Sequence, residues 1–270
     1  MRIVAFLFLI LLIEAVEAHE PLNEQINEVT TEIRQHPRDI EVLIKRGRLR
    51  LDSGSYDAAV DDFHHVLSMN PKNIAVHYYL AETYLAQNNN KRALAHANEF
   101  IHHASSKGAR SRGFELLGRI QIQAKNYSQA IQAYQQLVNL TTLPKPEYYL
   151  ILADTYIRVD KNDNASAISV LDEGMHKLGL LPVLQKQAID YEIHANNLQQ
   201  AIQRVDKLIV ANPHSFAFLK LKADILWQQG KKTQAKSVYQ SSIALLDKLP
   251  TSRKQSPGIH GLRNAMESRL

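Results

Sequence analysis

Small and apolar residues recur along the chain at a spacing that predicts helices. The repeated pattern is an alanine followed by apolar or small residues four and seven positions later, as in Ala59, Phe63 and Val66. Residues at these offsets lie on one face of an α-helix, so the pattern predicts amphipathic helices. It occurs six times, and its alanines are Ala59, Ala93, Ala130, Ala167, Ala201 and Ala235.

A second row of mostly small residues precedes these alanines. Its members lie twelve residues before the matching alanine, or fourteen in one case, and are Gly47, Ala81, Gly118, Ala153, Ile189 and Ala223. A small residue that faces an alanine lets two helix backbones approach closely, while a larger side chain one turn away fills the groove beside them. The two rows together predict pairs of helices that pack face to face.

Helix-breaking residues separate the predicted helices. Within each pair stand residues that tolerate the left-handed conformation closing a helix: Gly54-Ser55, Asn88 to Asn90, Lys125-Asn126, Asp160 to Asn164, Asn196-Asn197 and Gly230. Between pairs stand prolines, which cannot continue a preceding helix: Pro71, Pro144, Pro182, Pro213 and Pro250. We therefore predict six repeats of a helix, a tight turn, a second helix and a break.

This organisation resembles the tetratricopeptide repeat (TPR) family, whose 34-residue unit is a helix, a turn and a helix. Gly47, Ala59, Phe63 and Pro71 match the family's two small positions, its aromatic position and its proline position. The resemblance implies an all-α fold, a right-handed α-solenoid of about six TPR helical hairpins with capping helices at both ends. The units fall at 40–73, 74–107, 111–144, 146–181, 182–215 and 216–249.

Three departures from the family pattern predict less regular packing in the later units. Ile189 is large for its position, and Ser242 is polar where a small or apolar residue is expected. The fourth unit also carries two extra residues in its turn.

Both ends of the array are predicted to be capped, because a terminal unit would otherwise expose an apolar face. The N-terminal capping helix is placed at 19–39, stops at His36-Pro37, and has on one face Leu22, Ile26, Val29 and Ile33. Residues 250–270 are predicted to form a basic linker and a C-terminal helix. The linker contains a flexible stretch from Thr251 to Gly258, and the apolar row of the helix is Ile259, Leu262, Met266 and Leu270.

Residues 1–18 have the three parts of a secretory signal. Met1-Arg2 precede an uncharged run from Ile3 to Ile13, and Val16-Glu17-Ala18 places small residues where a signal peptidase cuts. The apolar run spans only about half of a 30 Å hydrocarbon core, which favours cleavage near Ala18 over a retained anchor. We expect an exported chain, periplasmic or secreted, whose membrane contact would come only from an uncleaved signal segment.

Composition narrows the class of partner. The chain has 270 residues, is 45% hydrophobic and 22% charged, carries a formal net charge of +5 and has no cysteine. Disorder, disulfide scaffolds, zinc fingers and thiol catalysis are excluded. Basic and acidic residues interleave rather than forming one basic stripe, so no nucleic acid partner is expected. The basic tail is predicted to be a solvated end, with contact to an anionic lipid or polymer as the alternative; it holds Arg253, Lys254, Arg263 and Arg269.

The sequence contains no motif that marks an enzyme or a cofactor site. GxGxxG, GxxxxGK[ST] and HExxH are absent, so we expect a non-enzymatic protein without a cofactor. The stretch from Asp160 to Ser166 imitates the start of a calcium loop. It fails because Ala165 occupies the glycine position and Leu171 the bidentate glutamate position.

Histidine is the one unusual residue type. Six of the twelve fall close together: His64, His65, His77, His96, His102 and His103. Adjacent histidines on a helix point about 100° apart, and no two are spaced four residues apart, so ordinary surface histidines are expected. The alternative is a metal-handling accessory protein that uses the histidine-rich second and third hairpins. A further alternative is copper binding by His19 as the first residue after cleavage.

The resemblance also implies where a partner would bind. In the family, the first helices of successive units line a concave groove, which suits an extended or helical peptide carrying charges of both signs. Ile44 and Leu150 are expected to add apolar contact. Carried onto this sequence, the partner groove consists of Arg48, Tyr78, Glu82, Arg112, Arg119, Asp154, Lys186, Asp190, Lys220, Asp224 and Trp227.

One known groove chemistry of the family is missing. Chaperone-binding members hold a C-terminal carboxylate with lysines, asparagines and an arginine in a fixed register. The corresponding residues here are Ile44, Arg48, Tyr79, Arg112 and Leu116. The favoured function is therefore a more general one, that of a non-enzymatic exported scaffold or adaptor in envelope assembly, secretion or maturation, which binds a protein or peptide in the concave groove.

Overall fold

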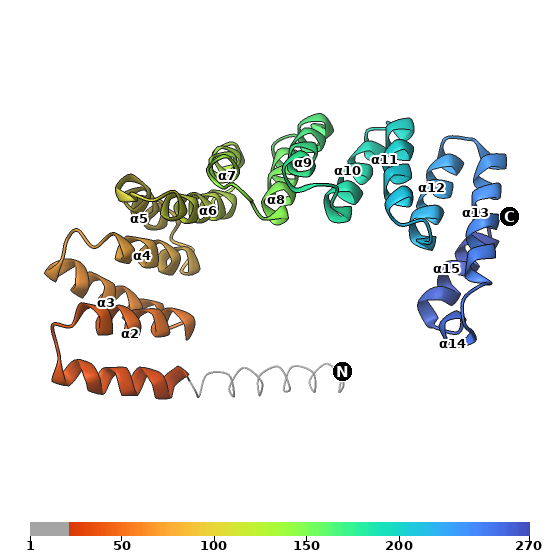
Figure 1. Cartoon of the computed structure of the whole chain (residues 1–270). Helices are drawn as coiled ribbons and strands as arrows, with labels where there is room; N and C mark the ends of the chain where they lie inside the picture. Colours follow the sequence, from red (N-terminus) through yellow and green to blue (C-terminus); the bar gives the residue numbers. More distant parts are fainter. Residues whose placement is uncertain (1–21) are drawn as a thin grey trace, which may run out of the picture. The chain divides into compact units, whose positions relative to one another are not determined.

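The computed structural model describes residues 22–270, which form helices and turns without any strand (Figure 1). The predicted signal segment at 1–18 and His19 lie outside the described residues. The chain divides into two compact units, the first ending at Thr142 and the second running from Leu143 to Leu270. The predicted all-α fold of consecutive helical hairpins is confirmed.

Unit 1 contains a first helix through residues 22–35 and three hairpins. The hairpins are α2 (Ile40–Asp52) with α3 (Tyr56–Met69), α4 (Ile74–Ala86) with α5 (Asn90–His103), and α6 (Lys107–Gln123) with α7 (Tyr127–Leu140). The contacts of α3 with α4 and of α5 with α6 stack the hairpins. Helix α6 begins four residues before the predicted unit start at 111, because Ser106 caps it by accepting a hydrogen bond from the Ala109 backbone N–H.

Unit 2 contains three more hairpins and two terminal helices. They are α8 (Pro146–Val159) with α9 (Asn164–Leu178), α10 (Pro182–His194) with α11 (Leu198–Ala211), α12 (Phe216–Gln228) with α13 (Lys232–Leu246), then α14 (Thr251–Lys254) and α15 (Pro257–Glu267). Helix α9 packs on α10, α11 on α12, and α15 on α13.

The small residues lie where the helices approach most closely, as the sequence predicts. All six repeat alanines have no exposed surface. A methyl group added at Gly47 would lie 2.5 Å from Cε1 of Phe63, and one at Gly118 would lie 2.5 Å from Cε2 of Tyr134. The aromatic ring therefore occupies the space that a glycine leaves open, which is the packing inferred from the two rows of small residues.

The turns within hairpins follow the predicted chemistry with one exception. Backbone φ is positive at Gly54, Asn88, Lys125, Asn196 and Gly230, the left-handed residues that end the first helix of their hairpins. The predicted breaker from Asp160 to Asn164 contains no such residue. Its two extra residues let the chain leave α8 through an extended Asp160, whose carboxylate accepts a hydrogen bond from the Asn162 N–H.

Two of the residues that depart from the family pattern lie in the core. Ile189 and Ser242 are both fully buried, and Ile189 lies in the apolar cluster of unit 2. The Ser242 hydroxyl has no hydrogen-bond partner among the described residues. The core therefore tolerates the large residue by packing around it and leaves the polar one unsatisfied.

The two ends differ in how well they follow the prediction. In the first helix Val29 is buried and Ile33 packs against the core of unit 1. The stretch from Thr251 to Gly258, predicted to be a flexible linker, instead contains α14 and the start of α15. Met266 is fully buried, but Leu270 lies beyond the end of α15 and is 43% exposed, so it does not join the apolar row. Among helices in residues 22–270, none is long and apolar enough to cross a membrane.

Candidate partner-binding surfaces

Five of the predicted groove residues come together on the first helices of the hairpins in unit 1. Arg48 is on α2, Tyr78 and Glu82 are on α4, and Arg112 and Arg119 are on α6. Helix α4 contacts both α2 and α6, so its side chains lie between those of its neighbours. We call this set, together with Tyr79, the α4 face.

Two tyrosines form the base of the α4 face. The Tyr79 ring stacks on Phe63 with ring centroids 5.6 Å apart, and the Tyr78 ring meets Phe100 edge to face at 5.2 Å. Both phenylalanines are buried in the hairpin core. The tyrosine rings themselves are only partly buried and lie 5.8 Å apart, so the core fixes two aromatic surfaces that solvent still reaches.

An arginine rests over each tyrosine. The guanidinium carbon of Arg48 lies 5.4 Å from the centre of the Tyr79 ring, and that of Arg112 lies 5.9 Å from the centre of the Tyr78 ring. These distances are within the range of favourable cation–π contacts. Both arginines are exposed, so stacking orients their side chains without removing them from solvent.

A chain of polar contacts runs along the same face from α4 to α6. The Tyr78 hydroxyl donates a hydrogen bond to Glu82 Oε1 at 3.1 Å, and Arg119 Nη1 lies 3.6 Å from the same oxygen. Burial, and next the neighbouring Glu82 carboxylate, raise the pKa of Tyr78 to about 12, so its hydroxyl remains a donor at neutral pH. Burial also raises the pKa of Glu82, while the Tyr78 hydrogen bond and Arg119 oppose that rise.

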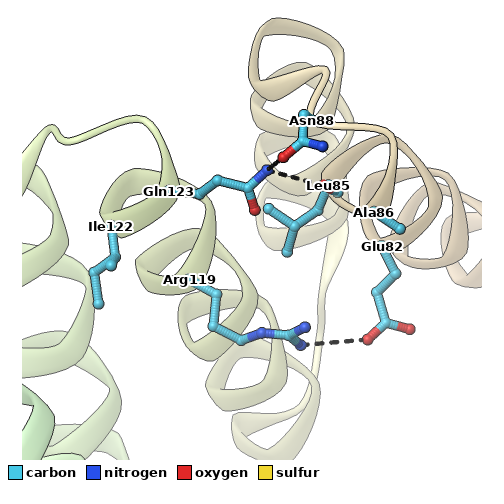
Figure 2. Close-up of a pocket in the computed structure, with 7 residues that line it drawn as sticks. All are labelled: Glu82, Leu85, Ala86, Asn88, Arg119, Ile122 and Gln123. Atoms are coloured by element: carbon cyan, nitrogen blue, oxygen red, sulfur yellow. Dashed lines mark hydrogen bonds and ion pairs between the residues drawn. The ribbon is translucent and has the colours of Figure 1, made fainter. Parts of the chain in front are cut away.

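A hollow of about 470 Å³ opens beside this chain (Figure 2). Figure 2 shows Arg119 reaching across it toward Glu82 and Gln123 reaching toward the end of α4. The Gln123 amide donates hydrogen bonds to the Leu85 carbonyl at 3.1 Å and to Asn88 Oδ1 at 2.7 Å. Leu85, Ala86 and Ile122 also line the hollow. It therefore offers apolar surface between the charged pair of Glu82 and Arg119 and the amides of Asn88 and Gln123.

The groove residues predicted for unit 2 are only partly brought together. Lys220 Nζ lies 2.7 Å from Asp224 Oδ2, and the Tyr239 hydroxyl donates to Asp224 Oδ1 at 2.5 Å. Burial, and next this hydrogen bond, raise the pKa of Tyr239. Trp227 lies under two cations, Lys232 Nζ at 5.5 Å and the Arg269 guanidinium carbon at 5.2 Å from the ring. A hollow of about 340 Å³ is lined by Lys220, Asp224, Trp227 and Tyr239 together with residues of the C-terminal segment, Arg269 included.

Other predicted groove residues stand apart. Asp154 pairs at 2.6 Å with Arg158 one turn along its own helix α8, and Lys186 and Asp190 are exposed on α10. Ile44 is only 8% exposed and belongs to the core cluster of unit 1, so it cannot supply the predicted apolar contact. The Ile44 side chain faces the core because α3 and α4 pack against α2.

Several residues that shape these surfaces are not among the predicted groove residues. Tyr79, Asn88, Gln123, Tyr239 and Arg269 all take part in the contacts described above. The adjacent pair Tyr78-Tyr79 is a visible signal, since both rings pack on core phenylalanines and stay partly exposed. The amide contact between Asn88 and Gln123 joins residues 35 positions apart and leaves no local pattern.

Three of the clustered histidines meet between α3, α4 and α5. His77 Nδ1 and His96 Nδ1 lie 3.0 Å apart, and His64 Nε2 lies 3.2 Å from the Tyr84 hydroxyl. Burial lowers the pKa of His77, and burial followed by the nearby His77 lowers the pKa of His96 to about 4. Both histidines are therefore neutral at pH 7 and can share one hydrogen bond.

The placement of these histidines corrects one prediction. They belong to the first and second hairpins, since α3, α4 and α5 carry all six, whereas α6 and α7 of the third hairpin carry none. Within residues 22–270, no group of three histidine or acidic side chains is arranged to hold a metal ion.

Comparison with known families agrees with the repeat architecture. Models described as tetratricopeptide repeat match residues 50–103, 115–140 and 187–250. None of the curated proteins matches the chain in sequence.

Several solved structures share the fold. The C-terminal part of a TPR repeat-containing protein from Cytophaga hutchinsonii is 16% identical, with a TM-score of 0.58 over 84% of this chain and 93% of that one. MamA from Desulfovibrio magneticus RS-1, residues 41 to the end, is 24% identical, with a TM-score of 0.51 over 58% of this chain and 85% of that one. Pseudomonas aeruginosa pilF is 17% identical, with a TM-score of 0.53 over 78% of this chain and 98% of that one. At these identities the likeness concerns the fold alone.

Proposed function

Because this chain belongs to the tetratricopeptide repeat family, we propose that it is a non-enzymatic scaffold or adaptor that binds a protein or peptide partner. The observation that carries the proposal is the α4 face, where two exposed arginines lie over two core-anchored tyrosines beside an open hollow. Helical repeat proteins generally present such extended surfaces to protein partners.

The physical character of the α4 face suits binding. Tyrosine and arginine are, with tryptophan, enriched among the residues that dominate the binding energy of protein interfaces. Here Phe63 and Phe100 hold the tyrosine rings before any partner arrives, so little side-chain freedom remains to be lost. The hollow beside Glu82 and Arg119 provides room for a partner side chain next to fixed polar groups.

The absence of a catalytic role is part of the proposal. The polar side chains of the α4 face are engaged with each other, as in the contacts of Glu82 with Tyr78 and Arg119. The raised pKa of Tyr78 keeps its hydroxyl protonated, so it is not available as a base near neutral pH. The face thus offers recognition groups rather than a nucleophile and a base.

Export is the second part of the proposal, and residues 1–18 support it through their basic start, apolar run and small residues before His19. The scaffold would then act outside the cytoplasm, in envelope assembly, secretion or maturation. Fractionation of the native host followed by N-terminal sequencing tests this part, because processed protein should begin at His19. Protein found only in the cytoplasm with Met1 retained would contradict export while leaving the binding proposal intact.

Site-specific photocrosslinking in the native host tests the binding function. We would replace Ala86, an exposed residue in the wall of the hollow, with a photoreactive amino acid, and Lys91, exposed on α5, as the matched control. We expect a discrete crosslinked protein from position 86 and none from position 91. The charge reversal R48E/R112E/R119E should reduce that product. Equal crosslinking at both positions, or a product insensitive to the charge reversal, would refute this face as the binding surface.

A further inference from the structure

Arg48 and Arg112 differ from Arg46, Arg50 and Arg119 of the same helices in lacking an acidic partner. On α2, Arg46 Nη2 lies 2.6 Å and Arg50 Nη1 2.8 Å from the carboxylate of Asp62, and on α6 Arg119 pairs with Glu82. Within the described part of the chain, Arg48 and Arg112 instead contact tyrosine rings and form no ion pair. The α4 face thus holds two guanidinium groups that are oriented by aromatic rings and whose charge no ion pair neutralises.

A guanidinium that rests on an aromatic ring is well suited to receive a carboxylate. It carries five N–H donors in a planar fork that matches the two oxygens of a carboxylate, and stacking restricts the side chain without consuming those donors. The tyrosines beneath are themselves packed on Phe63 and Phe100, so the orientation depends on the core and not on a mobile loop.

The acidic residues on and beside the α4 face leave the positive charge of Arg48 and Arg112 unpaired. Glu82 is partly buried and engaged by both Tyr78 and Arg119, so it is already compensated. Glu115 on α6 is partly buried and has a partner of its own. Asp52 is exposed, but it is the last residue of α2, one turn beyond Arg48. The uncompensated groups nearest the tyrosines are therefore cationic.

We infer that the α4 face binds an acidic segment of a protein partner, with side-chain carboxylates of that segment accepted by Arg48 and Arg112. The inference rests on the proposed scaffold function and specifies the chemistry of its partner. Apolar residues of the segment would pack on the rings of Tyr78 and Tyr79. They would also enter the hollow at Leu85 and Ile122. Since the arginines are exposed, the attraction should weaken as salt is added.

Defined peptides test the inference with the full chain. The probe is a fluorescein-labelled peptide of twelve residues, alternating glutamate and alanine and blocked at both ends. Matched peptides carry glutamine or lysine in place of glutamate, and a fourth has uncharged side chains and a free C-terminal carboxylate. Fluorescence anisotropy at low and at physiological salt gives each dissociation constant. We expect the glutamate peptide to bind at least tenfold more tightly than the other three.

Variants then assign the interaction to the two arginines. R48Q/R112Q should weaken glutamate-peptide binding at least tenfold, whereas R110Q/K91Q, which removes two exposed cations from α6 and α5, should change it less than twofold. R48K/R112K keeps the charge but loses the planar fork, so its affinity should fall severalfold. Circular dichroism should be unchanged in all variants because the replaced side chains are exposed.

Several results would overturn the inference. Equal binding of the glutamate, glutamine and lysine peptides, no binding of any peptide, or full affinity in R48Q/R112Q would each exclude an acidic segment at these arginines. Tighter binding of the lysine peptide would identify a basic partner, and preference for the free carboxylate peptide would identify a chain terminus. In each case a position-specific crosslink at residue 86 would keep the proposed scaffold function, so the two failures can be told apart.

Discussion

The close approach of Gly47 to Phe63 gives the sharpest prediction about stability. In Gly47→Ala, the new methyl carbon would lie 2.5, 2.8 and 2.9 Å from three carbons of the Phe63 ring. The ring has no exposed surface and is stacked on Tyr79, so it cannot move aside freely. Overpacking of this kind costs about 1–3 kcal/mol. Replacing glycine by alanine inside a helix returns up to about 1 kcal/mol, so we expect a net loss of about 1 kcal/mol.

Gly261→Ala is the matched control for this substitution. Gly261 lies inside α15, and apart from its chain neighbours and the backbone of its own helix no atom comes within 4 Å of the position its methyl group would take. The same gain in helix propensity therefore acts without a clash, and the control should stabilise α15 by up to about 1 kcal/mol. Because the propensity change is common to both substitutions, the difference between them measures the clash.

Hydrogen exchange followed by mass spectrometry is the appropriate assay, because it reports local stability in a repeat protein. In Gly47→Ala, amides of α2 and α3 should exchange about fivefold faster, the factor that corresponds to about 1 kcal/mol. In Gly47→Ala/Phe63→Leu the smaller side chain should relieve the clash, giving a favourable coupling of about 1 kcal/mol or more. Unchanged or slower exchange in Gly47→Ala would refute the argument that the small residue is required by the ring.

Three further predictions concern buried polar and titratable groups. Asp62→Asn leaves Arg46 and Arg50 without their common carboxylate, and because both arginines retain some solvent contact we expect a loss of about 2 kcal/mol in urea unfolding. Ser242→Ala removes a buried hydroxyl that has no partner in the described residues, so the urea midpoint should rise by the equivalent of about 1 kcal/mol. The pKa of His96 is lowered to about 4 in the folded chain, below its ordinary value near 6.5. Its protonation therefore favours unfolding, and its contribution to stability should be complete above pH 6.5 and be lost as the pH drops from 6.5 toward 4. His96→Asn should flatten that dependence in urea titrations across this range; an unchanged pH profile would show that His96 is not responsible.

The helices and their pairing could be predicted from the sequence because their causes are local. The small residues, the breakers Gly54 and Asn88, and the prolines each act within a turn or between two neighbouring helices. The exception at Asp160 shows the limit of that reasoning, since a longer turn closes without a left-handed residue. The stretch 251–258 shows a second limit, because α14 has no apolar pattern of its own and contacts α15, which packs on α13.

The candidate site could be predicted only in part. Family positions identified Arg48, Tyr78, Glu82 and the α6 arginines, and the structure places them together on the α4 face. They could not identify Tyr79 as a base for Arg48, because two adjacent tyrosines carry no signal of which ring an arginine from another helix will contact.

The arginines of α2 show most clearly which features follow from the sequence and which follow from the tertiary structure. The sequence by itself placed Arg46, Arg48 and Arg50 on one helix, and helical periodicity puts the first and last on the same side and Arg48 on another. Only the tertiary structure decided that α3 offers Asp62 to the first side and that α4 offers the Tyr79 ring to the second. The physical reason is distance: a carboxylate neutralises a guanidinium only within a few ångströms, and that separation depends on how neighbouring helices pack.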